Sequence, residues 1–315
     1  MTGASGFIGT RLVERLVAEG AEVVAIDLLP PRRAVEGVDY LPVDVRDPIP
    51  VDAARGVDVI YNLAAVHRTP GHPDHDYYDT NIRGALNVTA LAEANGVDRL
   101  VFTSSISVYG PTEDLVTEQS APAPVSAYGR SKLIAETVHS QWQARGPGRR
   151  LVLVRPGVVF GPGEGGNYTH LARALAGGYF VYPGRRDTIK SGGYVDDLIG
   201  ALDFALAQVD PMIAFNFAYP EQSTTQDIVQ AFGRVRGSAS SPLTIPTGLM
   251  LAAAAAFELA NTMGIRNPIH RQRILKLVQS TRVAPGWLLS RGYRFVHTLD
   301  TALEAWSSET SGRFV

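Results

Sequence analysis

The sequence predicts an α/β fold: a doubly wound parallel sheet followed by a smaller C-terminal lobe. Short apolar runs alternate with helical periodicity through the first 160 residues. The chain opens with the glycine-rich loop Gly3-Ala4-Ser5-Gly6-Phe7-Ile8-Gly9, and glycines at this spacing turn a strand tightly into a helix. A length of 315 residues, of which 45% are hydrophobic, suffices for a full core.

Residues 1–160 are expected to form the cofactor-binding domain. Apolar runs predict strands, and apolar residues three and four positions apart predict crossover helices. The predicted strands are 22–26, 39–43, 57–63, 100–104 and 151–155, and the predicted helices are 8–19, 78–95 and 128–144.

Residues 161–315 have a less regular pattern and are expected to form mainly a substrate-binding lobe, with some elements returning to the first domain. A helix is predicted over 195–208 and a strand over 214–217. The run 245–263 approaches the ~20 apolar residues that span a bilayer. Glu258 and Asn261 interrupt it, and a charge at bilayer depth costs ~2.5 kcal/mol or more. We expect a packed helix of a soluble fold, with membrane contact as the alternative.

Composition excludes several classes of protein. The net charge of −2 and the scattered arginines give no basic stripe, so nucleic acid is not an expected partner. The absence of cysteine excludes disulfides and thiolate metal sites, and no metal is expected. No secretion signal is recognised, which favours the cytoplasm.

Almost no strand precedes the glycine loop. In the strand order 3-2-1-4-5-6 the first strand is central, and without it the neighbouring strands have unpaired backbone groups, each costing ~1 to 3 kcal/mol. The first strand therefore reads as largely missing. We expect the working protein to begin about five to seven residues upstream, with an apolar strand of typical length.

Acidic residues follow the second and third predicted strands. Asp27 lies near the spacing of ~20 residues at which an acid hydrogen-bonds the adenosine ribose of NAD. Asp44, followed by Val45, is placed to meet the adenine amino group. A carboxylate at Asp27 repels the extra phosphate of NADP, so NAD is favoured, although Arg32 and Arg33 keep NADP open.

A tyrosine and a lysine share one helical face. Tyr128 and Lys132 are four residues apart, and a neighbouring ammonium together with a cationic nicotinamide is expected to lower the phenol pKa from its free value of ~10. Tyr128 then exchanges a proton with a substrate oxygen. Ser105, at the carboxyl edge of the sheet, is placed to hydrogen-bond that oxygen.

Together, Gly3-x-x-Gly6-x-x-Gly9, Asp27, Asn62-Leu63-Ala64-Ala65, Asn81, Ser105 and Tyr128-x-x-x-Lys132 resemble the extended short-chain dehydrogenase/reductase family. Ser104 to Gly110, Tyr128 to Lys132 and Gly193-Tyr194-Val195-Asp196-Asp197 look most like its NAD-dependent epimerase/dehydratase branch, which contains UDP-glucose 4-epimerase. The resemblance implies a Rossmann fold, bound NAD, transient oxidation of a sugar carbinol and a homodimer.

The resemblance also implies site residues. The implied catalytic residues are Ser105, Tyr128 and Lys132. The implied cofactor-binding residues are Gly3, Ser5, Gly6, Phe7, Ile8, Gly9, Asp27, Asp44, Val45, Leu63, Ala64, Ala65, Asn81, Thr103, Tyr128, Lys132 and Pro156. The implied substrate-binding residues are His67, Ser105, Ser107, Asn167, Lys190 and Arg266, with Arg185, Arg186 and Arg282 as further diphosphate ligands.

Two departures narrow the activity. Sugar 4,6-dehydratases of the family have an Asp-Glu pair directly after the active-site Ser or Thr, where this chain has Ile106 and Ser107, so dehydration is not expected. Lys190 replaces the usual diphosphate arginine, and Val158 replaces the usual asparagine. The expected function is an NAD-dependent nucleotide-sugar epimerase, acting at C4 on a UDP-linked sugar. A ketoreductase or dehydrogenase on a nucleotide ketosugar, a steroid- or flavonoid-type reductase and a redox-sensing binding protein are the alternatives.

Overall fold

A parallel sheet forms the centre of the protein. The computed structural model describes residues 1–68, 71–237, 242–262 and 271–315. The sheet contains β1 (Val24–Asp27), β2 (Asp39–Pro42), β3 (Ile60–Asn62), β4 (Arg99–Thr103), β6 (Arg150–Pro156) and β10 (Met212–Phe217). β2 pairs with β1, and β3, β4, β6 and β10 are neighbours in that order. Thr2 forms bridges to both Ile26 and Asn62, which joins the two parts.

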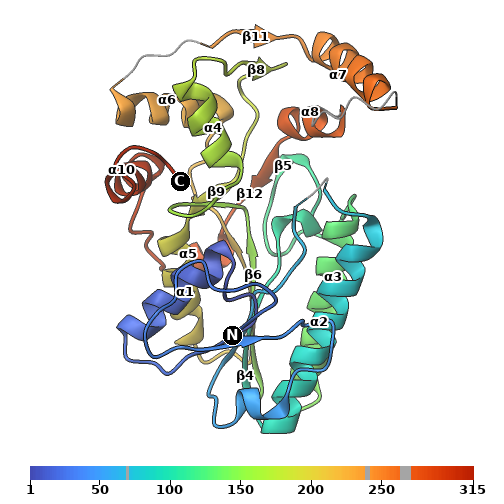
Figure 1. Cartoon of the computed structure of the whole chain (residues 1–315), viewed down its shortest axis with the longest axis vertical. Coiled ribbons are helices and arrows are strands. Elements are labelled where there is room, and N and C mark those ends of the chain that lie inside the picture. The colour runs from blue at the N-terminus through green and yellow to red at the C-terminus, as the bar shows by residue number, and fades with distance from the viewer. Residues whose placement is uncertain (69–70, 238–241, 263–270) are drawn as a thin grey trace.

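Helices cover both faces of this sheet (Figure 1). α2 (Asp74–Asn95) and α3 (Ala127–Ala144) pack on one face, and α1 (Phe7–Ala18) and α5 (Val195–Leu206) lie on the other. Successive strand side chains point to opposite faces. Val101 therefore joins the core cluster of α1 and α5, whereas its neighbours Leu100 and Phe102 join that of α2 and α3. The predicted doubly wound fold is confirmed, with β10 returning from the second half of the chain.

Most of the remaining elements lie beyond the carboxyl edge of the sheet, whereas η1 (Val51–Ala54) packs on α2 near the start of β4. Three small parallel pairs join strands far apart in the sequence: β5 with β12, β7 with β9, and β8 with β11. Their bounds are β5 (Thr112–Val116), β7 (Val158–Phe160), β8 (Tyr182–Pro183), β9 (Gly192–Tyr194), β11 (Thr244–Ile245) and β12 (Thr281–Val283). The helices are α4 (Asn167–Ala176), α6 (Thr225–Arg236), α7 (Thr247–Thr262), α8 (Arg271–Val278), α9 (Gly286–Ser290) and α10 (Leu299–Glu309), with short 3-10 turns η1 (Val51–Ala54) and η2 (Ile106–Val108).

The predicted apolar run 245–263 forms α7 over most of its length. α7 packs against α8, and both lie at the end of the long axis away from β4 (Figure 1). Within the described residues, no helix combines the length and apolar character that crossing a membrane requires.

One arginine ties the helix after the glycine loop to the second half of the chain. Arg11 on α1 binds the Asp196 carboxylate through Nε and Nη2, at 2.7 and 2.8 Å. It also donates to Glu309 on α10, at 3.0 Å. Because Asp196 lies in the first turn of α5, this arginine holds α1 against both α5 and α10.

Candidate active site

The glycine loop is packed too closely for side chains. Gly3 has a φ of +72°, and a Cβ there would lie 2.5 Å from the Ala64 amide nitrogen. A Cβ on Gly9 would lie 2.2 Å from the Gly3 carbonyl oxygen. The loop therefore presses against the end of β3 and against its own first turn. The first N–H groups of α1, which begins at Phe7, are directed toward the ligand side as in dinucleotide sites.

Asp27 lies beside this loop, at the carboxyl end of β1. Its Oδ2 accepts a hydrogen bond from the Ser5 amide at 2.9 Å, and its Oδ1 accepts one from the Leu29 amide at 2.9 Å. The two arginines that kept NADP open are engaged elsewhere. Arg32 donates to the Gly163 carbonyl at 2.6 Å, and Arg33 donates to Glu14. Asp27 is thus fixed against the glycine loop by two backbone amides, as its predicted role in binding the ribose requires.

The other two residues predicted to lie on the adenine side, Asp44 and Val45, follow β2 and differ in burial. Asp44 is paired with Arg46, at 2.6 Å between Oδ2 and Nη2, and this hydrogen bonding holds the pKa of Asp44 below its usual value. Val45 is buried and touches the place where a Cβ on Gly84 would lie. The carboxylate that was predicted to meet adenine therefore already has a cationic partner in the chain.

Ser105, Tyr128 and Lys132 come together at the carboxyl edge of β4. Ser126 caps α3 by accepting from the Gly129 amide, which places Tyr128 in the first turn. A Cβ on Gly129 would lie 2.3 Å from the Ser107 carbonyl oxygen, so this glycine lets α3 press against η2. Ser105 in turn accepts a hydrogen bond from the Ser107 amide at 3.1 Å. The close approach of α3 and η2 positions the tyrosine next to the serine.

The phenol pKa differs from the sequence expectation. Burial raises the pKa of Tyr128 to about 12, while its hydrogen bond with Ser105 acts in the opposite direction. Lys132 does not lower it, because its Nζ donates to the Thr103 carbonyl at 2.7 Å and lies 4.8 Å from the Phe102 ring centroid. Burial lowers the pKa of Lys132 to about 7, and Glu136 counteracts this. The expected lowering of the Tyr128 pKa by Lys132 is therefore not found in the structure.

A buried charged network lies directly behind these residues, and sequence reasoning missed it. Glu136, one turn after Lys132 on α3, binds Arg155 at 2.7 Å between Oε2 and Nη2. The Ser104 hydroxyl donates to the same carboxylate at 2.5 Å. Arg155 also donates to the Tyr109 hydroxyl at 2.7 Å, which donates to Asn216 at 2.9 Å. The sequence offered one clue to Glu136: it lies four residues after Lys132 and therefore on the same face of the helix.

The residues present fit a dinucleotide. The buried Thr103 hydroxyl has no hydrogen-bond partner within the described part of the chain, and it lies at the strand end where Lys132 is anchored. Asn81 bonds both to Val66 and to Ser131, at 3.0 and 2.8 Å, and so fixes the loop after β3 against α3. Pro156 is buried at the end of β6. The glycine cradle and the free hydroxyl together leave a place for a cofactor along this edge.

The predicted substrate-binding residues do not all lie at one place. Ser107 lies beside Ser105, with 3.1 Å between the two hydroxyl oxygens. His67 is exposed in the loop after β3, where desolvation and the positive charges of Lys132 and Arg68 lower its pKa. Asn167 is exposed at the start of α4. Arg266 lies outside the described residues.

Lys190 lies close to α8. Its Nζ donates to the carbonyl oxygens of Lys276 and Gln279, at 2.7 and 2.6 Å, which uses two of its three donors. Arg282 is near it, because Lys190 bridges Thr281, and the buried Arg282 Nε has no partner among the described residues. Arg185 and Arg186 are engaged, with Glu113 and Thr244 respectively.

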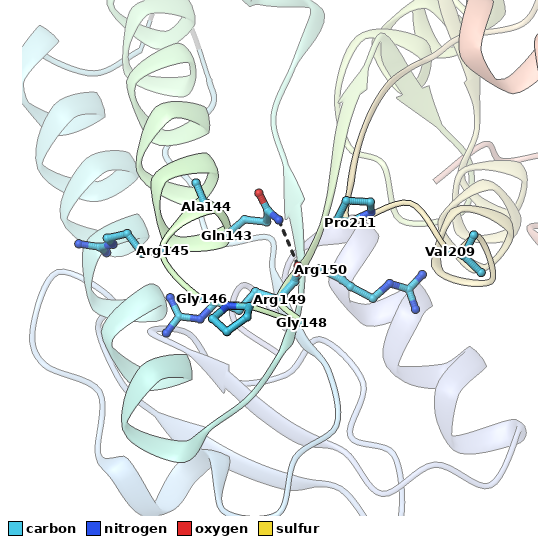
Figure 2. Close-up of a pocket in the computed structure, with 10 residues that line it drawn as sticks. Gln143, Ala144, Arg145, Gly146, Gly148, Arg149, Arg150, Val209 and Pro211 are labelled. Carbon is cyan, nitrogen blue, oxygen red and sulfur yellow. Dashed lines mark hydrogen bonds between the residues drawn. The ribbon is translucent and has the colours of Figure 1, made fainter.

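A separate hollow lies away from these residues (Figure 2). It is formed by the end of α3 and the loop before β10, with Gln143, Arg149, Arg150, Val209 and Pro211 among its lining. It contains no predicted catalytic residue. Across the described ranges, no three His, Asp or Glu side chains are grouped as a metal site.

The fold and the edge residues define a dinucleotide-binding enzyme with a Tyr-x-x-x-Lys pair. The profile of the NAD dependent epimerase/dehydratase family matches residues 1–218. The chain belongs to this family, and it is an NAD-dependent enzyme of the extended short-chain dehydrogenase/reductase type. The predicted family and cofactor are therefore confirmed.

Individual relatives cover nearly the whole chain. An Escherichia coli O157:H7 protein, N-acetyl-alpha-D-glucosaminyl-diphospho-ditrans,octacis-undecaprenol 4-epimerase, is 30% identical over 309 residues, 96% of this chain and 92% of the relative. MoeE5 in complex with UDP-glucuronic acid and NAD has a TM-score of 0.78 and 23% identity, with 98% of both chains covered. The UDP-glucose 4-epimerase of Thermus thermophilus, in complex with NAD, has a TM-score of 0.74 and 24% identity over 99% and 98% of the chains. These two likenesses establish the fold.

Proposed function

We propose that the protein is an NAD-dependent 4-epimerase of a diphosphate-linked sugar, with a nucleotide sugar as the first candidate substrate. The arrangement of Ser105 and Tyr128 at the carboxyl edge of β4 carries the proposal, because it offers a hydroxyl and a phenol to one substrate oxygen. Solved relatives of the same fold are named as UDP-sugar complexes or UDP-glucose 4-epimerases.

In this proposal Tyr128 takes the proton of the sugar 4-hydroxyl and later returns it to the same oxygen. Ser105 holds that oxygen by a hydrogen bond, and Ser107 orients Ser105. NAD, which the glycine loop and Asp27 would hold, would supply a reversible two-electron acceptor for the C4 hydride, so no net oxidant would be consumed. Lys132, anchored on the Thr103 carbonyl, is proposed to help hold the cofactor rather than to lower the pKa of Tyr128.

The residues after Ser105 support epimerisation over dehydration. Ile106 is buried and apolar, and Ser107 is committed to Ser105. These two residues therefore cannot supply the acid and the base that the elimination of water requires. A ketoreductase on a nucleotide ketosugar would use the same Ser105, Tyr128 and Lys132. The two activities therefore differ in whether turnover requires added NADH or NADPH.

A second candidate keeps this chemistry but changes the carrier of the sugar. The Escherichia coli relative is named for a sugar diphosphate attached to undecaprenol. In the present chain Lys190, the proposed diphosphate anchor, bonds to the carbonyls of Lys276 and Gln279 at the end of α8. A diphosphate bound at Lys190 would therefore lie close to α8, and so would the start of its carrier. This favours a polyprenyl diphosphate sugar as the second substrate class.

The test is incubation of the purified protein, without added cofactor, with UDP-glucose, UDP-N-acetylglucosamine or polyprenyl-diphospho-N-acetylglucosamine. Release of NAD on denaturation and formation of the 4-epimer of one substrate are the expected results. Turnover that occurs only with added NADH or NADPH would replace the epimerase with a reductase. No epimer from any of the three would reject the proposal.

A further inference from the structure

The outer side of α7 exposes apolar residues without charge. The exposed positions described on this helix are Gly248, Leu249, Ala252, Ala253 and Phe257. Leu249 is 64% exposed and Phe257 is 44% exposed. Positions 249, 253 and 257 are successive i, i+4 neighbours, so they form one stripe along the helix. Single exposed apolar residues are ordinary, but a helix that is apolar toward solvent as well as toward the core is not.

α8 adds both apolar and basic character at the same end of the molecule (Figure 1). Leu275 and Leu277 are 41% and 51% exposed. By sequence, α7 and α8 together contain the single acid Glu258 against three basic residues, Arg271, Arg273 and Lys276. Arg271 is paired with Glu258, at 2.7 Å between Nε and Oε2, so Arg273 and Lys276 give these two helices a net positive charge. We name the exposed apolar residues of α7 and α8, with Lys276, the α7–α8 surface.

We propose that the α7–α8 surface docks on the surface of a lipid bilayer that contains anionic phospholipid. Helices with exposed apolar side chains and neighbouring arginine and lysine lie in the interface, with the apolar side chains at the headgroup boundary. Basic residues are attracted to the negative surface potential of anionic lipids. The absence of a spanning helix among the described residues fits docking on one leaflet.

Charge favours a membrane over a second copy of the chain as the occupant. A two-fold dimer contact brings the same patch of both subunits together. The net positive charge of the α7 and α8 sequences would then face itself. An anionic bilayer instead presents the opposite charge.

The surface is continuous with the proposed substrate site. Lys190 bonds directly to the last turn of α8 and to Gln279 beyond it. A sugar diphosphate held at Lys190 would therefore have its lipid carrier beside the docked helices. This inference rests on the proposed function in its second form, and it makes a membrane-borne substrate accessible without extraction from the bilayer.

The test is sedimentation of the full chain, with NAD bound, with vesicles of phosphatidylethanolamine and phosphatidylglycerol, and separately with phosphatidylcholine alone. We expect binding to the anionic vesicles that weakens at high salt. Leu249→Glu and Phe257→Glu should each lower vesicle binding at least tenfold. The matched control is Val209→Glu, which places the same charge at a residue that is 91% exposed in the loop before β10, and it should bind as the wild type does.

Failure of the wild type to bind anionic vesicles, or unchanged binding by Leu249→Glu, would overturn the proposal. So would a stable dimer in solution that Leu249→Glu converts to monomer, because the surface would then be covered by a second copy. Circular dichroism confirms that each variant is folded. The binding measurement needs no turnover, so it fails independently of the epimerase assay.

Discussion

The sheet edge and the α7–α8 surface differ in where polar and apolar side chains lie: charged groups are buried at the sheet edge, and apolar groups are exposed on α7. At the sheet edge, Glu136 and Arg155 are buried charges whose polar atoms are paired with each other, with Ser104 and with Tyr109. On α7, Leu249 and the other exposed positions are uncharged. Burying a charge is tolerated only with good partners, and exposing a contiguous apolar surface marks an interaction site. The difference distinguishes the proposed active site, where charges are buried and paired, from the surface that we propose docks on a membrane.

The largest expected effect is on the chemistry at the sheet edge. Tyr128→Phe removes the hydroxyl that exchanges the proton, and general acid–base catalysis contributes typically 10²- to 10⁴-fold. We therefore expect kcat to fall by about that factor, with NAD retention and thermal stability near those of the wild type. The measurement is steady-state epimer formation together with NAD release on denaturation. Tyr179→Phe, at a tyrosine that is 69% exposed, is the matched control, and full activity in Tyr128→Phe would refute the assigned role.

The second effect concerns the buried ion pair. Glu136→Gln leaves the Arg155 guanidinium buried without its carboxylate, and breaking a buried pair on one side costs about 3–5 kcal/mol. Urea denaturation measures the loss in free energy of unfolding. The double variant Glu136→Leu with Arg155→Met removes both charges and should cost less than the single variant. A single variant as stable as the wild type would mean that water, rather than the pair, satisfies the arginine.

These two predictions mark what the sequence can and cannot reveal. Regular elements were predicted closely: β4 and α3 begin within one residue of their expected starts at 100 and 128. Tyr128 and Lys132 were found because their spacing is local. Glu136 and Arg155 lie on a helix and a strand whose contact depends on the sheet order, so spacing alone could not pair them.

Other parts of the site depend on contacts that leave no pattern in the sequence. Lys190 was predicted as a diphosphate ligand, but its carbonyl partners on α8 follow from the packing of the lobe. The strands β8 and β11 have two residues each, too few for periodicity. The pKa of Tyr128 was expected to fall because of Lys132, and the sequence could not show that Thr103 holds this ammonium or that burial raises the phenol pKa to about 12.

A third prediction tests whether water reaches the buried side chain of His139 beside the sheet. His139 is fully buried and stacked on Phe102. Its Nδ1 lies 2.7 Å from the Ala135 carbonyl and must donate, so Nε2 accepts from the Asn62 amide at 3.1 Å. Protonation would place two donors face to face. Burial accordingly lowers the pKa of His139 from 6.5 to about 4.

Because the folded-state pKa is the lower one, the unfolded chain takes up the proton first. The contribution of His139 to stability is complete above pH ~6.5 and is lost as pH falls toward ~4, by roughly 2 to 3 kcal/mol in all. Unfolding free energies measured across this range should fall less steeply in His139→Gln than in the wild type. His170→Gln, at an exposed histidine on α4, should keep the wild-type slope. Identical slopes for wild type and His139→Gln would show that water reaches the ring.

The smallest expected effect is on the α7–α8 surface itself, and it tests the comparison most directly. Leu249 is 64% exposed whereas Leu202 on α5 is fully buried. Truncating a buried leucine to alanine costs about 2–5 kcal/mol, whereas surface changes usually stay within ~0.5 kcal/mol. In denaturation without vesicles, Leu202→Ala should show the large loss and Leu249→Ala almost none. A loss above about 2 kcal/mol for Leu249→Ala would mean that α7 is already covered in solution, and the contrast between a satisfied edge and an open apolar surface would no longer hold.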